Sequence, residues 1–196
     1  MSIALVDGTG AGYEAGVNST NQLEVFAETG SEETKAAERG DGYNFNTDVV
    51  TMTTAAATPL IYLKNEQDED FIISAIAVGV GAVTSATDPA IIRMIRNPDS
   101  IDFSTAISSE GNRNFGASKT FTGLAYEGVT GDTVTGGDVL AVFYQSGSGR
   151  LFAPINFVLP KGKDMCLTIE CNQGSGNVNV YGAVVGYYDI HSVATG

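Results

Sequence analysis

The chain has 196 residues, 43% of them hydrophobic, and carries 23 acidic residues against ten basic ones, which gives a formal net charge of −13. This length and composition are those of a folded protein that needs neither a disulfide nor a metal to hold its core. The charge disfavours nucleic acid and anionic membrane surfaces, because both are bound through Lys and Arg. We therefore expect no nucleic-acid partner and no membrane partner.

The N-terminal segment is rich in glycine, and its pattern raises the question of a nucleotide site. Gly10, Gly12 and Ala15 have the spacing of a dinucleotide-binding turn, but that turn must open a helix. The residues that follow, "GVNSTNQLEV", are poor helix formers and leave no room for a crossover helix. We instead predict an extended arm over residues 1–30, followed by one β-sandwich domain over residues 31–196. The apolar side chains of the arm that we expect to contact partners are Val17, Leu23, Val25 and Phe26.

One short helix is predicted, in "SEETKAAERG", where Ser31 can cap the first turn and Gly40 can end the last. The remaining sequence predicts strands separated by turns. "FIISAIAVGVGAV", residues 71–83, is apolar on both faces, with Ile73 and Ala75 on one face and Ile76 and Val78 on the other, which predicts a strand that is central or covered on both sides. The other strands expected along the chain cover residues 48–54, 59–64, 90–96, 138–145 and 150–158, with further strands in "TFTGLAYEGV", "DMCLTIECNQ" and "NVNVYGAVVGYYDIHSV".

Glycine, Asn, Asp and Pro mark the turns between these strands. Asn97-Pro98-Asp99 closes the strand at 90–96, and residues 103–120 predict a long loop or a pair of weak edge strands. "SGSGR", residues 146–150, predicts a hairpin between its two flanking strands, and "NQGSGN", residues 172–177, predicts a second hairpin joining the last two strands. About eight to ten short strands without strand–helix alternation indicate an all-β fold, an antiparallel β-sandwich of the jelly-roll kind.

The aromatic residues of these strands are expected to fill the sandwich core. The ones we assign to the core are Phe143, Tyr144, Phe152 and Phe157. Tyr187 and Tyr188 are adjacent in a strand and therefore point to opposite faces, one into the core and one toward a subunit contact. Cys166 and Cys171 also fall on opposite faces, so they cannot bridge each other, and two free thiols suit a reducing compartment.

The sequence gives no specific pattern for catalysis, although a pair of carboxylates among its 23 acidic residues, or His191 with Cys166 or Cys171, leaves an enzyme open as a third alternative. The single histidine, His191, lies near the end of the sequence, and no Trp is available to line a sugar-binding cleft. Four side chains of the acidic turn 65–70 could supply oxygen ligands to calcium: Asn65, Glu66, Asp68 and Asp70. Their spacing is not that of an EF-hand, and we leave open whether this turn binds a metal. We expect a protein without enzymatic activity or cofactor.

Three stretches carry a resemblance to a class of proteins. They are "TKAAERGDGYNFNTDVVTMT", "TPLIYLKNEQDEDFIISAIAV" and "FVLPKGKDMCLTIEC" followed by "NVNVYGAVVGYYD". Together with the glycine-rich arm they resemble tailed-phage virion proteins in which a jelly-roll domain decorates or cements the capsid. The resemblance implies a homotrimer on the virion, made in the host cytoplasm, whose arm clips onto neighbouring subunits and whose partner is the major capsid protein.

A second function fits the same fold. A receptor-binding or fibre-head module would use the same sandwich to recognise a glycan or a host surface protein, through an exposed loop site such as 103–120. The two alternatives differ in their partner, which is a capsid in the first case and a cell surface in the second.

Overall fold

The computed structural model describes residues 31–52, 56–81, 89–107, 109–171 and 177–193, together with four short strands before residue 31. The chain divides into two units, Met1–Ser31 and Glu32–Gly196. The strands of the first unit are β1 (Ala4–Val6), β2 (Gly12–Glu14), β3 (Gly16–Val17) and β4 (Leu23–Glu24). They form two antiparallel pairs, β1 with β2 and β3 with β4. A dinucleotide-binding turn joins parallel strands through a helix, and the β1–β2 pairing differs from that arrangement.

The second unit begins with α1 (Glu32–Arg39), the helix that the sequence predicts. Acidic residues occupy its first turn and Arg39 its last, which suits the helix dipole, and Gly40 ends it with a φ of +79°. Ala36 is fully buried and anchors the helix to the rest of the unit. Among the described residues, no helix has both the length and the apolar content to cross a membrane.

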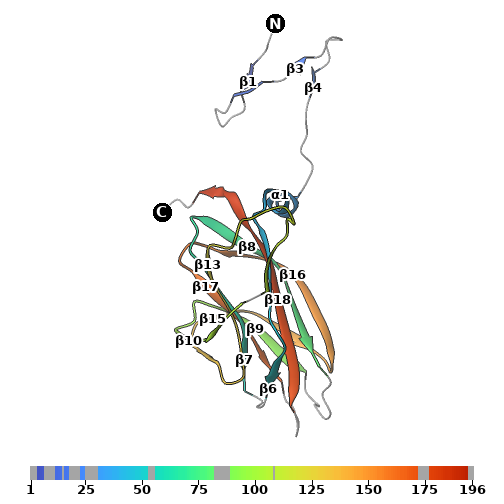
Figure 1. The fold of residues 1–196 in the computed structure, drawn as a ribbon, viewed down its shortest axis with the longest axis vertical. Helices are drawn as coiled ribbons and strands as arrows, with labels where there is room; N and C mark the ends of the chain where they lie inside the picture. The colour runs from blue at the N-terminus through green and yellow to red at the C-terminus, as the bar shows by residue number, and fades with distance from the viewer. Residues whose placement is uncertain are drawn as a thin grey trace. The chain divides into compact units, whose positions relative to one another are not determined.

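Two six-stranded antiparallel sheets make up the body of the second unit (Figure 1). The first, which we call the β9 sheet, has the strand order β11 (Thr105–Ala106), β13 (Gly123–Glu127), β7 (Thr58–Asn65), β17 (Asp164–Glu170), β9 (Ala90–Arg96) and β15 (Asp138–Gln145). The second, the β8 sheet, has the order β12 (Ser109–Asn112), β5 (Gly42–Asn46), β18 (Val178–Val193), β8 (Glu69–Val80) and β16 (Gly149–Leu159), and β6 (Val50–Met52) also pairs with β18. A separate ribbon joins β10 (Ser100–Asp102) to β14 (Thr133–Thr135). The predicted all-β antiparallel sandwich is confirmed.

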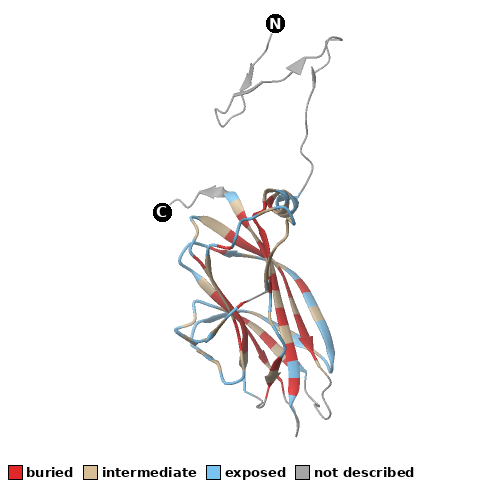
Figure 2. Cartoon of the chain, viewed as in Figure 1, coloured by how far each residue is buried: buried red, intermediate tan, exposed pale blue. Residues whose placement is uncertain are grey.

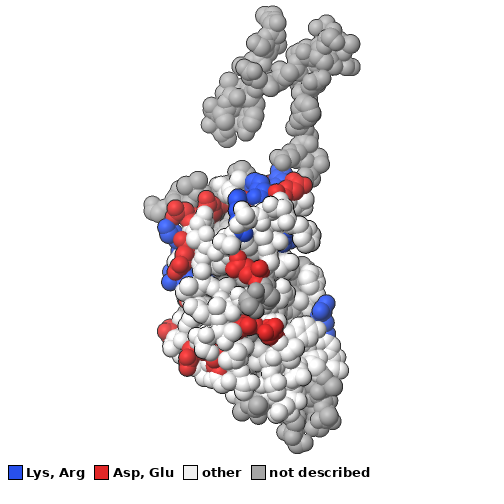
Figure 3. Space-filling model, viewed as in Figure 1, with Lys and Arg blue, Asp and Glu red and all other residues white. Residues whose placement is uncertain are grey.

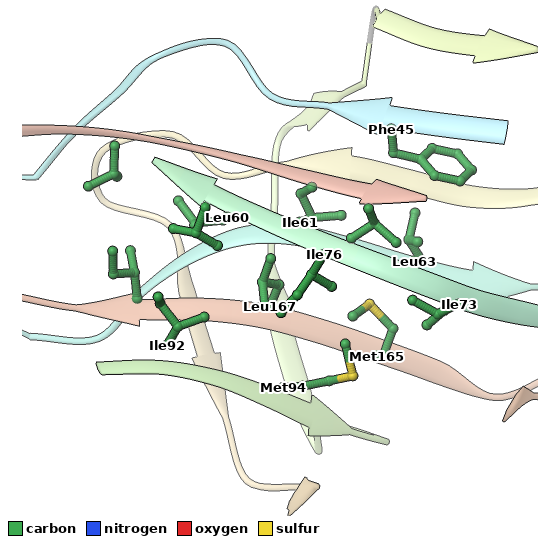
Figure 4. Close-up of a cluster of buried hydrophobic side chains, with 14 of the residues drawn as sticks. Phe45, Leu60, Ile61, Leu63, Ile73, Ile76, Ile92, Met94, Met165 and Leu167 are labelled. Atoms are coloured by element: carbon green, nitrogen blue, oxygen red, sulfur yellow. The ribbon is translucent and has the colours of Figure 1, made fainter. Parts of the chain in front are cut away.

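Apolar side chains of the two sheets meet in one continuous core. In Figure 4, side chains such as Leu63 of β7, Ile76 of β8 and Leu167 of β17 point into the space between the strands, and all three are fully buried. A group of aromatic rings fills the end of the core nearest α1, where Tyr43 and Phe45 pack against Phe71 and Phe121. Figure 2 shows the buried residues concentrated on the strands inside the sandwich. The two-layer arrangement therefore rests on burial between sheets.

The central position predicted for residues 71–83 is confirmed, because β8 lies between β18 and β16. The predicted division of its faces is wrong in one respect. The pairing with β18 skips Ser74, so Ile73 and Ile76, predicted on opposite faces, both belong to the core cluster. The extra residue is a β-bulge, which rotates the strand by one position and cannot be read from alternation. The Ser74 hydroxyl lies 3.1 Å from a Glu33 carboxylate oxygen and 3.3 Å from the Val185 carbonyl oxygen.

Two predicted hairpins are wrong. Residues 146–150 do form a turn, but β15 pairs with β9 and β16 pairs with β8, so the turn carries the chain from one sheet to the other. Gly147 and Gly149, with φ values of +64° and +154°, supply backbone conformations that other residues avoid. The last two strands are separated in the same way, since β17 belongs to the β9 sheet and β18 to the β8 sheet. A turn of this sequence can reverse the chain within one sheet or carry it to the other sheet. The turn alone therefore does not determine which strand becomes the partner.

Candidate association surface

β15 and β16 are the edge strands on one side of the two sheets. β15 has eight residues and pairs only with β9, and β16 has eleven and pairs only with β8, within the part of the chain that the structure describes. Exposed edge strands of this length are usually shortened, charged or covered, because their free backbone groups invite pairing with another chain. Their presence identifies this side of the sandwich as a place where partners can bind.

Large apolar side chains project from both edge strands into solvent. Tyr144 and Phe152 are 64% and 63% exposed, so their predicted place in the core is wrong. Phe143 and Phe157 are half-buried and pack against the core, as predicted. The reason is strict alternation, since Ala141 and Phe143 face inward and Tyr144 faces outward on β15. Figure 2 shows this alternation of buried and exposed residues along β16. We call the exposed side chains the β15–β16 edge: Val139, Leu140, Val142, Tyr144, Phe152 and Val158.

Between the two edge strands lies a crevice of about 390 Å³. Its floor is apolar and belongs to the core, where Ile73, Met94 and Met165 are fully buried. Leu159 is also buried, and the side chains closer to solvent are Arg96, Asn97, Leu140, Phe157, Val158, Pro160, Lys163 and Asp164. We call this cavity the edge crevice. An apolar hollow open to solvent at a sheet edge has the character of a site that receives a hydrophobic group.

A buried amide fixes one side of the edge crevice. Asn65 is fully buried, and its Nδ2 donates hydrogen bonds to the carbonyl oxygens of Leu159 and Glu69, both at 2.9 Å. Its Oδ1 accepts a hydrogen bond from the backbone N–H of Gln67 at 2.9 Å. The side chain therefore ties the turn after β7 to the end of β16, two segments that are far apart in sequence. The polar turn at 66–68 lies where the sequence predicts it.

The acidic turn 65–70 uses several of its polar groups within the chain. Asp68 pairs with Lys161, and Glu66 lies 3.6 Å from the Lys64 ammonium. Among the residues that the structure describes, no group of three His, Cys, Asp or Glu side chains lies together as metal ligands would. The amide oxygen of Asn65 is already an acceptor for Gln67. The turn therefore serves the packing of neighbouring strands.

Asp164, at the mouth of the edge crevice, accepts a hydrogen bond from the Tyr62 hydroxyl at 2.7 Å. Burial, then this hydrogen bond, raise the pKa of Tyr62 well above its ordinary value. The Tyr62 ring packs beside Phe103 and Tyr126 on the outer side of the β9 sheet. These contacts keep Asp164 in place beside the crevice.

A second exposed apolar feature lies at the opposite edge of the β8 sheet. Phe115 follows β12 by three residues and is fully exposed, with a relative accessibility of 108%. It lies in the region 103–120, where the structure confirms the predicted weak edge strands as β11 and β12. Its neighbours in "NRNFGAS" are polar or small, and no other apolar ring shields it.

Asparagine side chains hold the Phe115 loop in shape. Asn112 donates to the Gly40 carbonyl at 2.7 Å and accepts from the Asn114 N–H at 2.9 Å. Asn114 donates to the Glu38 carbonyl at 2.6 Å. The same side chain accepts from the Gly116 N–H at 2.9 Å. Hydrogen bonds on both sides of Phe115 thus present an apolar ring on an ordered loop.

The basic residues of the chain are almost all paired. All ten lie within the described residues; eight have an acidic partner within 4 Å, and Arg150 lies over the Tyr181 ring at 5.8 Å. Lys163, at the crevice mouth, is the one described Lys or Arg without such a partner. On the face shown in Figure 3, charged side chains gather near α1. Glu38 is exposed on α1. Its backbone carbonyl accepts the hydrogen bond from Asn114, which places it beside the Phe115 loop.

The two cysteines are free and buried, and Cys171 joins the core cluster whereas Cys166 does not, in agreement with the predicted opposite faces. Burial raises the pKa of both thiols, which makes them poor nucleophiles. Tyr188 is buried in the core and Tyr187 is half-buried on the other face. The side chain of His191 lies outside the described residues.

The predicted contact residues of the arm are only partly placed. Val17 and Leu23 are backbone partners in the β3–β4 pair. Their side chains, and all of Val25 and Phe26, lie outside the described residues. The structure therefore brings the first two together along the backbone, and their role in contacts stays a prediction.

No family model matches the chain, and no curated protein sequence matches it.

Proposed function

We propose that this chain is a non-enzymatic structural protein of a phage particle, a capsid decoration subunit that associates with itself and bridges neighbouring major capsid proteins. The β15–β16 edge carries the proposal. Six large apolar side chains project there around an open crevice, on a chain with a strongly acidic composition. A concentrated apolar surface on a charged protein is typical of an association site.

The chemistry of the interior supports a structural role. Two of the buried polar side chains serve backbone contacts: Asn65 bonds carbonyl groups of two strands, and Glu127 accepts from the Asp48 N–H at 2.7 Å. Buried side chains that satisfy the backbone stabilise a fold and are unsuited to proton transfer with a substrate. The resemblance of the sequence to capsid-decorating proteins points in the same direction.

Binding to capsids tests the proposal directly. Heads assembled from the major capsid protein of the same phage are mixed with the purified chain and separated from free protein on a density gradient. We expect the chain to move with the heads at saturable stoichiometry, and to raise the temperature at which they disassemble. Chain that stays at the top of the gradient at all concentrations would contradict the proposal.

Deletion of residues 2–16 separates attachment from folding. We expect the shortened chain to retain its sheet content by circular dichroism and its self-association, but to bind heads more weakly, because a tether raises the effective concentration of weak contacts. Unchanged head binding by the shortened chain would remove the arm from the mechanism.

One observation favours a receptor-binding module as the second candidate. The exposed ring of Phe115 stands in the loop region where such a site is expected, and exposed aromatic rings often contact glycans and proteins. The two functions separate in one experiment, in which labelled chain is offered to host cells and to heads. Binding to cells that Phe115→Ala abolishes, without binding to heads, would favour the receptor module.

A further inference from the structure

We infer that copies of this chain join head to tail, with Phe115 of one copy inserted into the edge crevice of the next. This inference rests on the self-association in the proposed function and specifies how it is made. It joins the two apolar features that the structure leaves in solvent, a projecting ring and a hollow.

The projecting ring is already arranged for binding. The side chains of Asn112 and Asn114 make five hydrogen bonds to backbone groups around Phe115, so the loop is ordered before any contact forms. A preorganised aromatic residue loses little conformational entropy on binding. Such anchors, when they enter a pocket on the partner, dominate interface energetics.

The crevice has room for the ring. An engineered cavity of about 150 Å³ in another protein accepts benzene, which has the size of the Phe side chain. The edge crevice measures about 390 Å³, and its floor consists of Ile73, Met94 and Met165. An apolar ring fits this lining, whereas a charged or strongly polar ligand would leave its own groups without partners on the floor.

The charges beside the two features are complementary. Glu38 is exposed next to the Phe115 loop, and among the residues that the structure describes its carboxylate has no ion-pair partner. Lys163 stands at the crevice mouth as the one described basic residue without an acidic or aromatic partner. Insertion of Phe115 brings a neighbour's carboxylate toward this ammonium group. An ion pair between Glu38 of one copy and Lys163 of the next attracts the two copies and fixes their relative orientation.

The position of the two features determines the kind of assembly. Phe115 follows β12, one edge of the β8 sheet, and the crevice lies against β16, its other edge. A contact between different surfaces of two copies is heterologous, and it gives a ring where the rotation between copies closes and an open filament where it does not. Pairing of β16 with a neighbour's backbone is a weaker alternative, because Pro154 lacks an N–H and the ladder is irregular between Pro154 and Phe157.

Mass measurements on purified full-length proteins test the inference. The first is the unchanged chain, the second is Phe115→Ala, and the third is Val158→Glu, which places a charge at the exposed crevice mouth. Val49→Ala is the matched control, because Val49 is also exposed, at 62%, and lies outside both features. Circular dichroism establishes that each variant is folded before its mass is measured by sedimentation.

We expect the unchanged chain and the Val49→Ala variant to form a species larger than a dimer, either a closed ring or an open filament. Phe115→Ala and Val158→Glu should each weaken association by about 100-fold or more, a size typical of a dominant anchor. Mixed together, these two variants should form heterodimers, because one keeps the crevice and the other keeps the ring. Glu38→Lys should weaken association by about 10-fold, and the double variant Glu38→Lys, Lys163→Glu should recover it.

Two failures are distinguishable. A folded, unchanged chain that is a monomer or a simple dimer overturns the inference, and head binding then decides the proposed function separately. An unchanged chain that forms larger oligomers, which Phe115→Ala and Val158→Glu leave intact, overturns the inference and leaves self-association standing. Recovery in the mixture or in the charge-reversed double variant supports the head-to-tail contact, since neither follows from a loss of folding.

Discussion

Replacement of Asn65 by alanine should destabilise the second unit strongly, although no apolar core residue is removed. The side chain makes three hydrogen bonds in a fully buried position, two as donor and one as acceptor. At about 1 kcal/mol each, their loss lowers the free energy of unfolding by about 3 kcal/mol. The carbonyl groups of Glu69 and Leu159 also lose a buried partner, so the true value should not be smaller.

Urea denaturation followed by circular dichroism measures this change. Tyrosine fluorescence gives a second probe, because the chain has no Trp. Asn156→Ala is the matched control, since Asn156 is exposed on β16 and should change stability by less than about 0.5 kcal/mol. A loss below about 1 kcal/mol for Asn65→Ala, with an unchanged denaturant slope, would refute the reasoning.

Asn65→Asp refines the same test through pH. The carboxylate of this variant would face two carbonyl oxygens in a buried site, which raises its folded-state pKa above the unfolded value. Because the folded-state pKa is raised, the free energy of unfolding of this variant is highest at low pH, and it falls as the pH rises through the folded-state pKa. The deficit of this variant against the unchanged chain should therefore be larger at pH 8 than at pH 4.5, measured by urea midpoints at both values. Equal deficits would contradict the assigned contacts.

Three further predictions concern other parts of the second unit. Thr168→Val should raise the free energy of unfolding by about 1 kcal/mol in urea denaturation, because the buried Thr168 hydroxyl has no hydrogen-bond partner. Gly128→Ala should lower it by about 2 to 3 kcal/mol, since an added Cβ would overlap the Pro59 carbonyl oxygen; Gly111→Ala serves as the control, because its Cβ would come no closer than 4.0 Å to the Asn44 carbonyl oxygen. Burial, helped by nearby carboxylates, raises the pKa of Tyr43 to about 12, so stability should fall as the pH rises from about 10 to about 12. Tyrosinate absorbance that rises fully near pH 10 in the folded protein would contradict this assignment.

Local signals in the sequence were sufficient to place most elements. The helix at Glu32–Arg39 follows from its acidic first turn and the glycine after it, and β9 occupies residues 90–96 as predicted. The turn at Asn97 is also confirmed, with a φ of +44° there. These features depend on residues within a few positions of one another, which is why a single sequence reveals them.

Strand pairing could not be predicted in the same way. The turn at 146–150 has hairpin chemistry, yet β15 and β16 pair with strands of different sheets. That choice depends on β9 and β8, which lie far away in sequence and compete for the same edges. The bulge at Ser74 has a similar origin, because it accommodates β18. The outward position of Tyr144 follows from the register that this pairing sets, so the surface role of the aromatic residues could not be known in advance.

Part of the candidate site carried a sequence signal that was missed. Phe115 is a lone aromatic residue between Asn114 and a glycine, in a segment without apolar alternation. A buried ring normally has apolar neighbours at strand or helix spacing, so its isolation indicated exposure. The edge crevice carried no such signal, because its lining comes from strands that converge only in the folded chain, among them β8, β9 and β16.

The edge strands combine an attractive surface with backbone features that limit uncontrolled pairing. Pro154 removes a donor from β16, and irregular pairing interrupts the ladder on β15 between Val139 and Ala141. Such features prevent strands of other chains from adding indefinitely. These features leave side-chain contacts unaffected. Leu140, which lies in the irregular segment of β15, is one of the side chains that line the crevice. A protein that must join a defined number of copies benefits from this division, because ring-into-hollow contacts stop growing once the assembly closes into a ring, whereas open addition of edge strands does not stop.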